Sequence, residues 1–176
     1  MLKMFTTQLS GVFKKIAENE EFSFEDGARL LAQAAAGDGF IYIFGAKEMK
    51  AVPAEALEGA EAMGSAKELT TANLSELTDA DRVLLFTRTS DDSEALALAD
   101  ALLEQDIPFV AVSSNIDDGT GRLAEMADVH IDLRLTKGLL PDEAGGRFGV
   151  PSSMAALFVY YGLKFTIDEI LAEYEE

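Results

Sequence analysis

Four continuous apolar segments do most to limit the possible folds of this 176-residue chain. They are rich in β-branched and aromatic residues and occupy residues 40–44, 82–87, 108–112 and 129–133. Uninterrupted runs of this kind are typical of strands that are buried on both faces of a parallel sheet. The segments between them have helical patterns, at about 50–62, 93–105 and 121–126. This alternation, with a short strand at 67–69, predicts a three-layer α/β/α protein with a doubly wound parallel sheet of about five strands.

Further helices are expected at both ends of the chain. Apolar residues three or four apart predict an amphipathic docking helix over 1–20. A second helix follows over 24–36, with Ser23 as its N-cap. A helix over 152–163 and a separate acidic helix over 166–176 end the chain. At this length we expect a single domain, residues 1–176, whose core spans 24–165.

Composition excludes several classes of function. The chain has no cysteine and one histidine, so a disulfide framework, a thiolate nucleophile and a cysteine-ligated metal site are excluded. Its 32 acidic and 14 basic residues leave a net charge of −18, which repels nucleic acid and anionic membranes. No stretch has the length of a membrane span or the pattern of a signal peptide. We therefore expect a cytoplasmic protein that binds neither nucleic acid nor membranes.

Ligands of doubly wound proteins bind beyond the carboxyl ends of the strands, near the point where the strand order switches. This rule selects three segments, residues 45–49, 87–93 and 113–115. The second of them carries hydroxyl groups where a buried strand leads into a helix, at Thr87, Thr89, Ser90 and Ser93. A helix N-terminus with hydroxyl groups favours an anion such as phosphate. Helix capping by Ser90 or Asp91 explains the same residues equally well.

The segment 84–94, followed by a helix and then by 108–114, resembles the core of the sugar isomerase (SIS) domain family. Within that family, phosphoheptose isomerases are the nearest comparison in size, and the chain as a whole also resembles an uncharacterised group of SIS-like bacterial proteins. The resemblance implies a flavodoxin-like SIS fold, a phosphorylated sugar or similar anion as ligand, and a homodimer or homotetramer. It also implies roles for individual residues: phosphate binding by Thr89, Ser90 and Ser93, the first loop glycine at Gly45, and a catalytic glutamate at Glu58.

The chain departs from the family pattern at two places. The loop after Gly45 reads Ala-Lys-Glu-Met instead of being rich in glycine and serine, and Asp91 replaces the usual glycine after the hydroxyl groups. Lys47 and Arg88 are available there as cationic contacts. The last helix begins Pro151-Ser152-Ser153 and lacks the histidine of the isomerases, while His130 falls within a strand, as a packed or edge residue.

Several functions therefore remain open. The leading hypothesis is an SIS-fold sensor, regulatory module or degenerate isomerase that binds a phosphorylated sugar without a cofactor, with Arg147, Ser152 and Ser153 as a second set of anion contacts. An active phosphoheptose-type isomerase would use Glu58 as its base, although Glu58 also suits a solvated helix face. A third hypothesis is a protein that acts only through interactions or one that depends on a divalent metal. The candidate metal ligands are Asp91, Asp92, Asp117 and Asp118.

Overall fold

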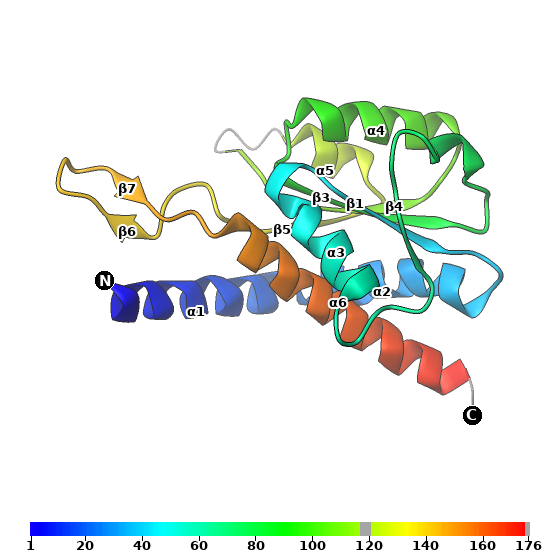
Figure 1. Cartoon of the computed structure of the whole chain (residues 1–176), viewed down its shortest axis with the longest axis horizontal. Coiled ribbons are helices and arrows are strands. Elements are labelled where there is room, and N and C mark those ends of the chain that lie inside the picture. Colours follow the sequence, from blue (N-terminus) through cyan, green and yellow to red (C-terminus); the bar gives the residue numbers. More distant parts are fainter. Residues whose placement is uncertain (117–120, 175–176) are drawn as a thin grey trace.

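The computed structural model describes residues 1–116 and 121–174, and its centre is a five-stranded parallel sheet covered by helices on both faces (Figure 1). The strand order is β2-β1-β3-β4-β5. The strands are β1 (Ile41–Gly45), β2 (Ala66–Glu68), β3 (Arg82–Thr89), β4 (Phe109–Ser114) and β5 (Val129–Asp132). The predicted α/β class, with a doubly wound parallel sheet of five strands, is confirmed.

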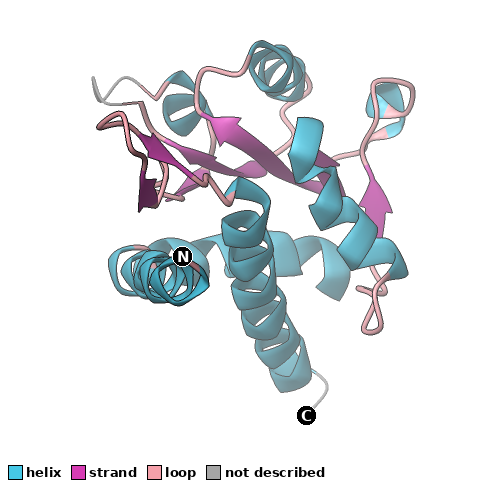
Figure 2. Ribbon diagram, turned by 60° about the vertical axis from the view of Figure 1, so that its left-hand side comes forward, coloured by secondary structure: helices cyan, strands magenta, loops and turns pink. Residues whose placement is uncertain are grey.

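The helices form the two outer layers (Figure 2). One face of the sheet is covered by α4 (Ser93–Glu104) and α5 (Arg122–Met126). The other face is covered by α1 (Leu2–Asn19), α2 (Glu21–Ala36), α3 (Ala51–Glu58) and α6 (Ser152–Tyr174). Successive strand residues point to opposite faces, so that Ile43 packs into the larger core under α2 and α6 while Phe44 packs into the core under α4. Two short 3-10 turns, η1 (Lys47–Lys50) and η2 (Leu74–Glu76), complete this part of the chain.

Two predicted helix boundaries are wrong. Ser23 does not cap α2, because this helix begins at Glu21, directly after α1, and the N–H of Phe24 donates to the carbonyl of Glu20. The separate acidic helix over 166–176 is instead the last part of one continuous helix, α6. Lys164, inside the predicted break, lies 2.7 Å from the Asp168 carboxylate one turn later, which supports a continuous helix.

The Gly- and Pro-rich segment 138–151 is more ordered than the loop that its composition predicts. It forms a short antiparallel hairpin of β6 (Leu140–Pro141) and β7 (Arg147–Phe148). The Asp142 carboxylate accepts hydrogen bonds from the N–H groups of Ala144 and Gly146 and so closes the turn. The hairpin extends from the domain beside the N-terminal half of α1 (Figure 1).

The strand order switches direction at β1 and β3, which pair in parallel from Ile41 opposite Arg82 to Gly45 opposite Phe86. In β3 the register shifts between Phe86 and Thr89, where β3 uses one residue more than β4. Bulges of this kind change the direction of a side chain near the end of a strand. The crevice that doubly wound proteins use for ligands therefore lies beside residues 46–50 and 87–90.

No helix in the described part of the chain is long and apolar enough to cross a membrane.

Candidate functional site

A cavity of about 600 Å3 opens at the carboxyl ends of β1, β3 and β4, the edge selected by the sequence. We call it the edge cavity. Its walls come from the turn after β1, the ends of β3 and β4, the segment after β5 and the start of α6. The lining residues are Glu48, Arg88, Thr89, Ile116, Leu135, Thr136, Val150, Ser152 and Ser153. The site thus combines one cation, one carboxylate and several hydroxyl groups with an apolar floor.

An ion pair between Glu48 and Arg88 spans the edge cavity. The guanidinium donates from Nε to Glu48 Oε1 at 2.7 Å and from Nη2 to Oε2 at 2.9 Å. The Ser152 hydroxyl donates to the same Oε1 at 3.0 Å. A bidentate contact of this geometry is the strongest form of arginine–carboxylate pairing. It joins β3, η1 and α6 at the site.

The ion pair has a marked effect on the acidity of Glu48. Hydrogen bonds from Arg88 lower the pKa of Glu48 to about 2, against an opposing contribution from burial, and Ser152 adds to the lowering. Glu48 is therefore fully ionised at neutral pH. A carboxylate with so low a pKa is a weak base, because a general base works best with a pKa near the operating pH.

A second ion pair lies next to the first. Asp92 is the N-cap of α4: its Oδ1 accepts from the Ala95 N–H at 3.0 Å, and its Oδ2 lies 3.0 Å from Lys47 Nζ. Burial opposes ionisation of Asp92, but the bonds from Ala95 and Lys47 hold its pKa below the ordinary value. Lys47 itself adopts a left-handed backbone with φ of 52°, a conformation that favours glycine. The prediction that Ser90 or Asp91 caps this helix is therefore wrong in its residue, because the cap is Asp92.

The three hydroxyl groups predicted to bind phosphate lie in three different environments. Thr89 lines the edge cavity, whereas Ser93 is exposed at the start of α4. Ser90 is fully buried; its N–H donates to the carbonyl of Ser114, and its hydroxyl has no partner within residues 1–116 and 121–174. A Cβ added at Gly121 would lie 3.2 Å from Ser90 Oγ, so this hydroxyl faces the chain before α5.

Glycine is required at position 45 because another part of the backbone approaches it closely. A Cβ at this position would lie 2.2 Å from the carbonyl oxygen of Met49, so only glycine permits the turn η1 to fold back over the end of β1. This close approach places Glu48 at the cavity. Gly45 is buried and is not among the residues that line the edge cavity.

The start of α6 supplies the other wall. Ser152 and Ser153 line the cavity, and the Ser152 N–H donates to the carbonyl of Val150. Among the described residues, no side chain accepts a hydrogen bond from the first N–H groups of α6, because the residue before the helix is Pro151, whose side chain has no acceptor, and the Ser152 hydroxyl is directed to Glu48. An uncapped N-terminus of a 23-residue helix carries a partial positive charge.

Two predicted residues lie away from the edge cavity. Glu58 is exposed at the last position of α3, whose first residue Ala51 is the one near the site. Arg147 lies on β7, and its guanidinium donates from Nε to the carbonyl of Gly138 at 2.7 Å and from Nη2 to that of Leu139 at 2.8 Å. Arg147 therefore does not act together with Ser152 and Ser153.

His130 is on β5, the edge strand next to β4, with its Nε2 2.7 Å from the Ser113 hydroxyl oxygen. Burial lowers the pKa of His130, and the negative charge of Asp132 offsets this in part. His130 is not a lining residue of the edge cavity.

Within the described residues, no group of three or more acidic or histidine side chains has a geometry that suits a metal ion. Asp92 is bound to its own helix and to Lys47, and Asp91 is exposed. Asp117 and Asp118, the other two candidate ligands, lie outside the residues that the structure describes.

Sequence reasoning missed Glu48 as a site residue, together with the segment around Thr136. Glu48 follows β1 by three residues and Arg88 lies near the end of β3. Because β1 and β3 are paired in parallel, residues at the carboxyl ends of the two strands lie close together, and the sequence offered this signal for Glu48. No comparable signal exists for Thr136, which follows β5 and is brought to the cavity by hydrogen bonds between Leu135 and the Ser114 hydroxyl.

Solved structures of other proteins share this doubly wound fold. The NanR protein of Vibrio vulnificus, solved with ManNAc-6P, superposes with a TM-score of 0.68 at 14% identity and 97% coverage of this chain. The chain spans only 61% of the NanR chain. A phosphoheptose isomerase from Francisella tularensis also gives 0.68, at 12% identity, covering 93% of this chain and 94% of its own. At these identities the likeness establishes the fold.

Sequence comparison gives the family. Residues 1–171 match the family described as Domain of unknown function (DUF2529), so the chain belongs to the DUF2529 family. A relative from Bacillus subtilis (strain 168), Uncharacterized protein YwjG, is 46% identical over 174 residues, which cover 99% of each chain. The family assignment therefore rests on sequence similarity, and the SIS-type fold rests on structural similarity.

Proposed function

We propose that this protein binds a phosphorylated sugar in the edge cavity and acts as a sensor or regulatory module and not as an isomerase. The observation that carries the proposal is the convergence of Arg88, the hydroxyl groups of Thr89 and Ser153, and the uncapped start of α6 on one cavity of about 600 Å3. A volume of this size accepts a sugar phosphate. SIS-fold proteins that bind such ligands, NanR with ManNAc-6P among them, support the choice of ligand class.

The position of the phosphate follows from where positive charge remains. The N-terminus of α4 is already occupied by the Asp92 carboxylate, so an anion gains little there. The N-terminus of α6 has no side-chain cap among the described residues and faces the cavity through Ser152 and Ser153. The proposed phosphate therefore sits between α6 and Arg88, with the sugar on the side of Leu135 and Thr136.

Phosphate binding at Arg88 competes with Glu48. Both oxygens of the Glu48 carboxylate are bonded to the guanidinium, so the ligand must displace Glu48 or share Arg88 with it. The Glu48 side chain is 29% exposed, which allows water to solvate it after displacement. In this proposal Glu48 acts as an internal anion that fills the site in the absence of ligand.

The acid and base groups of the cavity favour binding over isomerisation. Moving a proton between adjacent carbons requires a base with a pKa near neutral. The carboxylate in the cavity, Glu48, has a pKa of about 2, and Glu58 is exposed at the distal end of α3. His130 is on the edge strand β5 and bonded to Ser113. A binder that returns its ligand unchanged fits this arrangement.

Calorimetric titration with five-, six- and seven-carbon sugar phosphates tests the proposal, with the unphosphorylated sugars as controls. We expect saturable binding of at least one phosphate and of none of the free sugars. Arg88→Ala removes the binding, whereas Arg122→Ala, which breaks an exposed pair with Asp100, leaves it unchanged. Failure of the whole phosphate panel would refute the proposal.

The same ligands, followed by NMR after incubation with the protein, separate binding from catalysis. We expect every sugar phosphate that binds to be recovered unchanged. Interconversion of aldose and ketose forms would establish an isomerase, and its loss in Glu58→Gln would identify Glu58 as the base.

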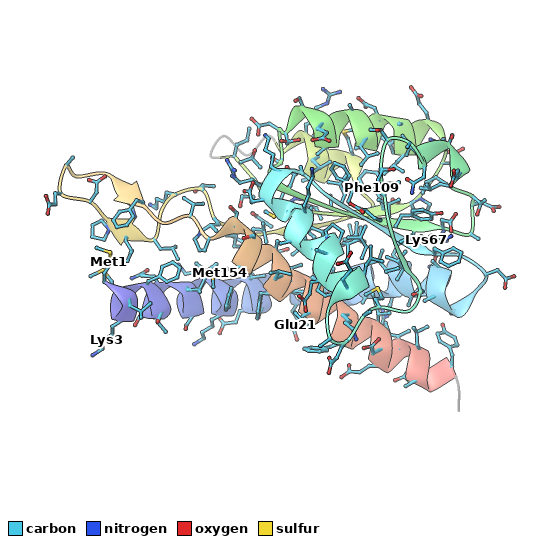
Figure 3. The ribbon with its side chains drawn as sticks, in the orientation of Figure 1. Met1, Lys3, Glu21, Lys67, Phe109 and Met154 are labelled. Atoms are coloured by element: carbon cyan, nitrogen blue, oxygen red, sulfur yellow. The ribbon has the colours of Figure 1, made fainter. Side chains whose placement is uncertain are left out.

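We further infer that the protein is a cytoplasmic homodimer or homotetramer. Large apolar side chains are exposed at the free end of α1 and on the hairpin beside it; Met1 is 83% and Leu2 78% exposed, and Phe148 and Val150 are exposed on the hairpin. Figure 3 shows Met1 at the end of α1 that lies beside the hairpin. A surface of this composition suits contact with a second copy.

A further inference from the structure

A second cavity, of about 200 Å3, lies between α1, the segment after β5 and the base of the β6–β7 hairpin. We call it the basic cavity. It is lined by Gln8, Gly11, Val12, Lys15, Leu133, Arg134, Thr136, Lys137, Gly138, Leu139 and Arg147. Four of these residues are basic and none is acidic, although the chain carries 32 acidic and 14 basic residues.

Half of the basic side chains of the protein, including Arg134 of the basic cavity, are paired with an acidic neighbour. Seven of the 14 form ion pairs: Lys14, Arg29, Lys47, Arg88, Arg122, Arg134 and Lys164. Of the seven that form no ion pair within residues 1–116 and 121–174, three line the basic cavity, namely Lys15, Lys137 and Arg147. Grouping like charges around one small cavity raises its positive potential.

The two arginines that line the basic cavity are held in place before any ligand arrives. Arg147 is fixed by the carbonyls of Gly138 and Leu139, which are not negatively charged groups and therefore leave its positive charge in place. Arg134 has a left-handed backbone with φ of 54°, held by a bond from its N–H to the Asp132 carboxylate. A non-glycine residue kept in this conformation stores strain, and such strain often marks a binding site.

The basic cavity is separate from the edge cavity but adjacent to it. Thr136 lines both, so the two cavities meet at the segment after β5. Leu135 in that segment is joined to Ser114 at the end of β4 by hydrogen bonds of 3.1 and 3.3 Å. Each cavity thus has its own cations: Arg88 in one, and Lys15, Lys137 and Arg147 in the other.

We propose that the basic cavity is a second anion site, which binds a small molecule carrying a diphosphate group. Three cations from three separate segments of the chain exceed what one phosphate group requires, and their combined charge matches a diphosphate more closely. Lysine suits a phosphate as a point charge, and the free edge of the Arg147 guanidinium supplies directed donors. This proposal does not depend on the ligand of the edge cavity.

Isothermal titration with inorganic pyrophosphate tests the proposal, in a buffer that contains a chelator and no divalent cation. The parent protein carries Arg88→Ala, so that the edge cavity takes no part. We expect saturable binding to this parent, weakened at least about tenfold by Lys15→Glu and by Lys137→Glu, and abolished when the two are combined. Both lysines are exposed and make no side-chain bond among the described residues, so both variants should fold.

Lys3→Glu and Lys50→Glu are the matched controls. They change the net charge by the same amount at exposed positions outside the basic cavity and should alter the pyrophosphate affinity less than about threefold. Equal weakening in all four variants would show that pyrophosphate senses only net charge, and absence of saturable binding to the parent would overturn the site itself. Either result leaves the proposed sugar-phosphate binding at Arg88 untouched.

Discussion

Replacing Glu48 by glutamine should lower the stability of the protein and raise its affinity for phosphate. Glutamine keeps the size of the side chain and one oxygen acceptor for Arg88 and Ser152, but it removes the negative charge. In the native protein that charge is held by two bonds from the guanidinium, at 2.7 and 2.9 Å. The ion pair and the proposed ligand use the same cation, so the two effects should have opposite signs.

The size of the effect follows from the acidity of Glu48. A fall of its pKa from 4.5 to about 2 corresponds to an upper limit of about 3 kcal/mol in favour of the ionised form. Arg88 is 53% exposed, so water screens the pair and reduces this to about 1–2 kcal/mol. Glu48→Gln should lower the free energy of unfolding by that amount at pH 7, and it should tighten binding of inorganic phosphate by about 5- to 30-fold.

The stability difference should also depend on pH. Because folding depresses the pKa of Glu48, its contribution is fully present above about pH 4.5 and is lost as the pH falls from there towards 2. Urea unfolding of the wild type and Glu48→Gln at pH 7, 5, 4 and 3 measures this convergence, and titration calorimetry at pH 7 measures phosphate binding. Glu68→Gln, at an exposed position on β2, is the control and should change neither quantity.

The reasoning fails if Glu48→Gln weakens phosphate binding, because Glu48 would then contact the ligand instead of competing with it. It fails equally if the stability difference persists unchanged at pH 3.

Three further outcomes are expected. Asp81→Ala should cost about 2–4 kcal/mol in urea unfolding, because the buried carboxylate accepts bonds from the N–H groups of Phe40 and Thr78 and from the Thr78 hydroxyl. Since burial lowers the pKa of His130, the unfolded chain takes up a proton first, so the wild type should lose stability as the pH falls from 7.5 to 5.5 and His130→Asn should lose less. Leu2→Glu should shift the sedimentation coefficient towards that of a monomer, and an unchanged oligomer would place the interface elsewhere.

The parallel sheet was predictable because each of its central strands is an apolar run that only burial on both faces can accommodate. The continuous helix α6 was not, because local signals around Gly162 and Thr166 favour a break. A Cβ at Gly162 would lie 2.6 Å from the ring of Phe24 on α2, so this glycine serves close helix packing. Such a contact between distant segments cannot be read from local propensity.

The site was predictable in position but not in detail. The rule that ligands bind at the carboxyl edge selected the turn after β3, and the edge cavity lies beside this turn. Which side chains of that turn reach the cavity depends on the register shift in β3, and that shift is set by pairing with β4. Thr89 lines the cavity and Ser90, one residue further on, is buried beneath the chain before α5. No pattern in the sequence signals this difference.

In the two proposed sites, a chain with a net charge of −18 would bind anions in different ways. At the edge cavity the one lining cation, Arg88, is paired with Glu48, so an anionic ligand gains only the difference between its own interaction with Arg88 and that of Glu48. Binding there should be selective and readily reversible, as a sensor requires. At the basic cavity Lys15, Lys137 and Arg147 have no acidic neighbour to displace among the described residues. The negative charge of the rest of the protein confines the positive potential of these three side chains to the cavity. The affinity of the edge cavity for an anion should therefore depend on Glu48. The affinity of the basic cavity for an anion should depend on the salt concentration.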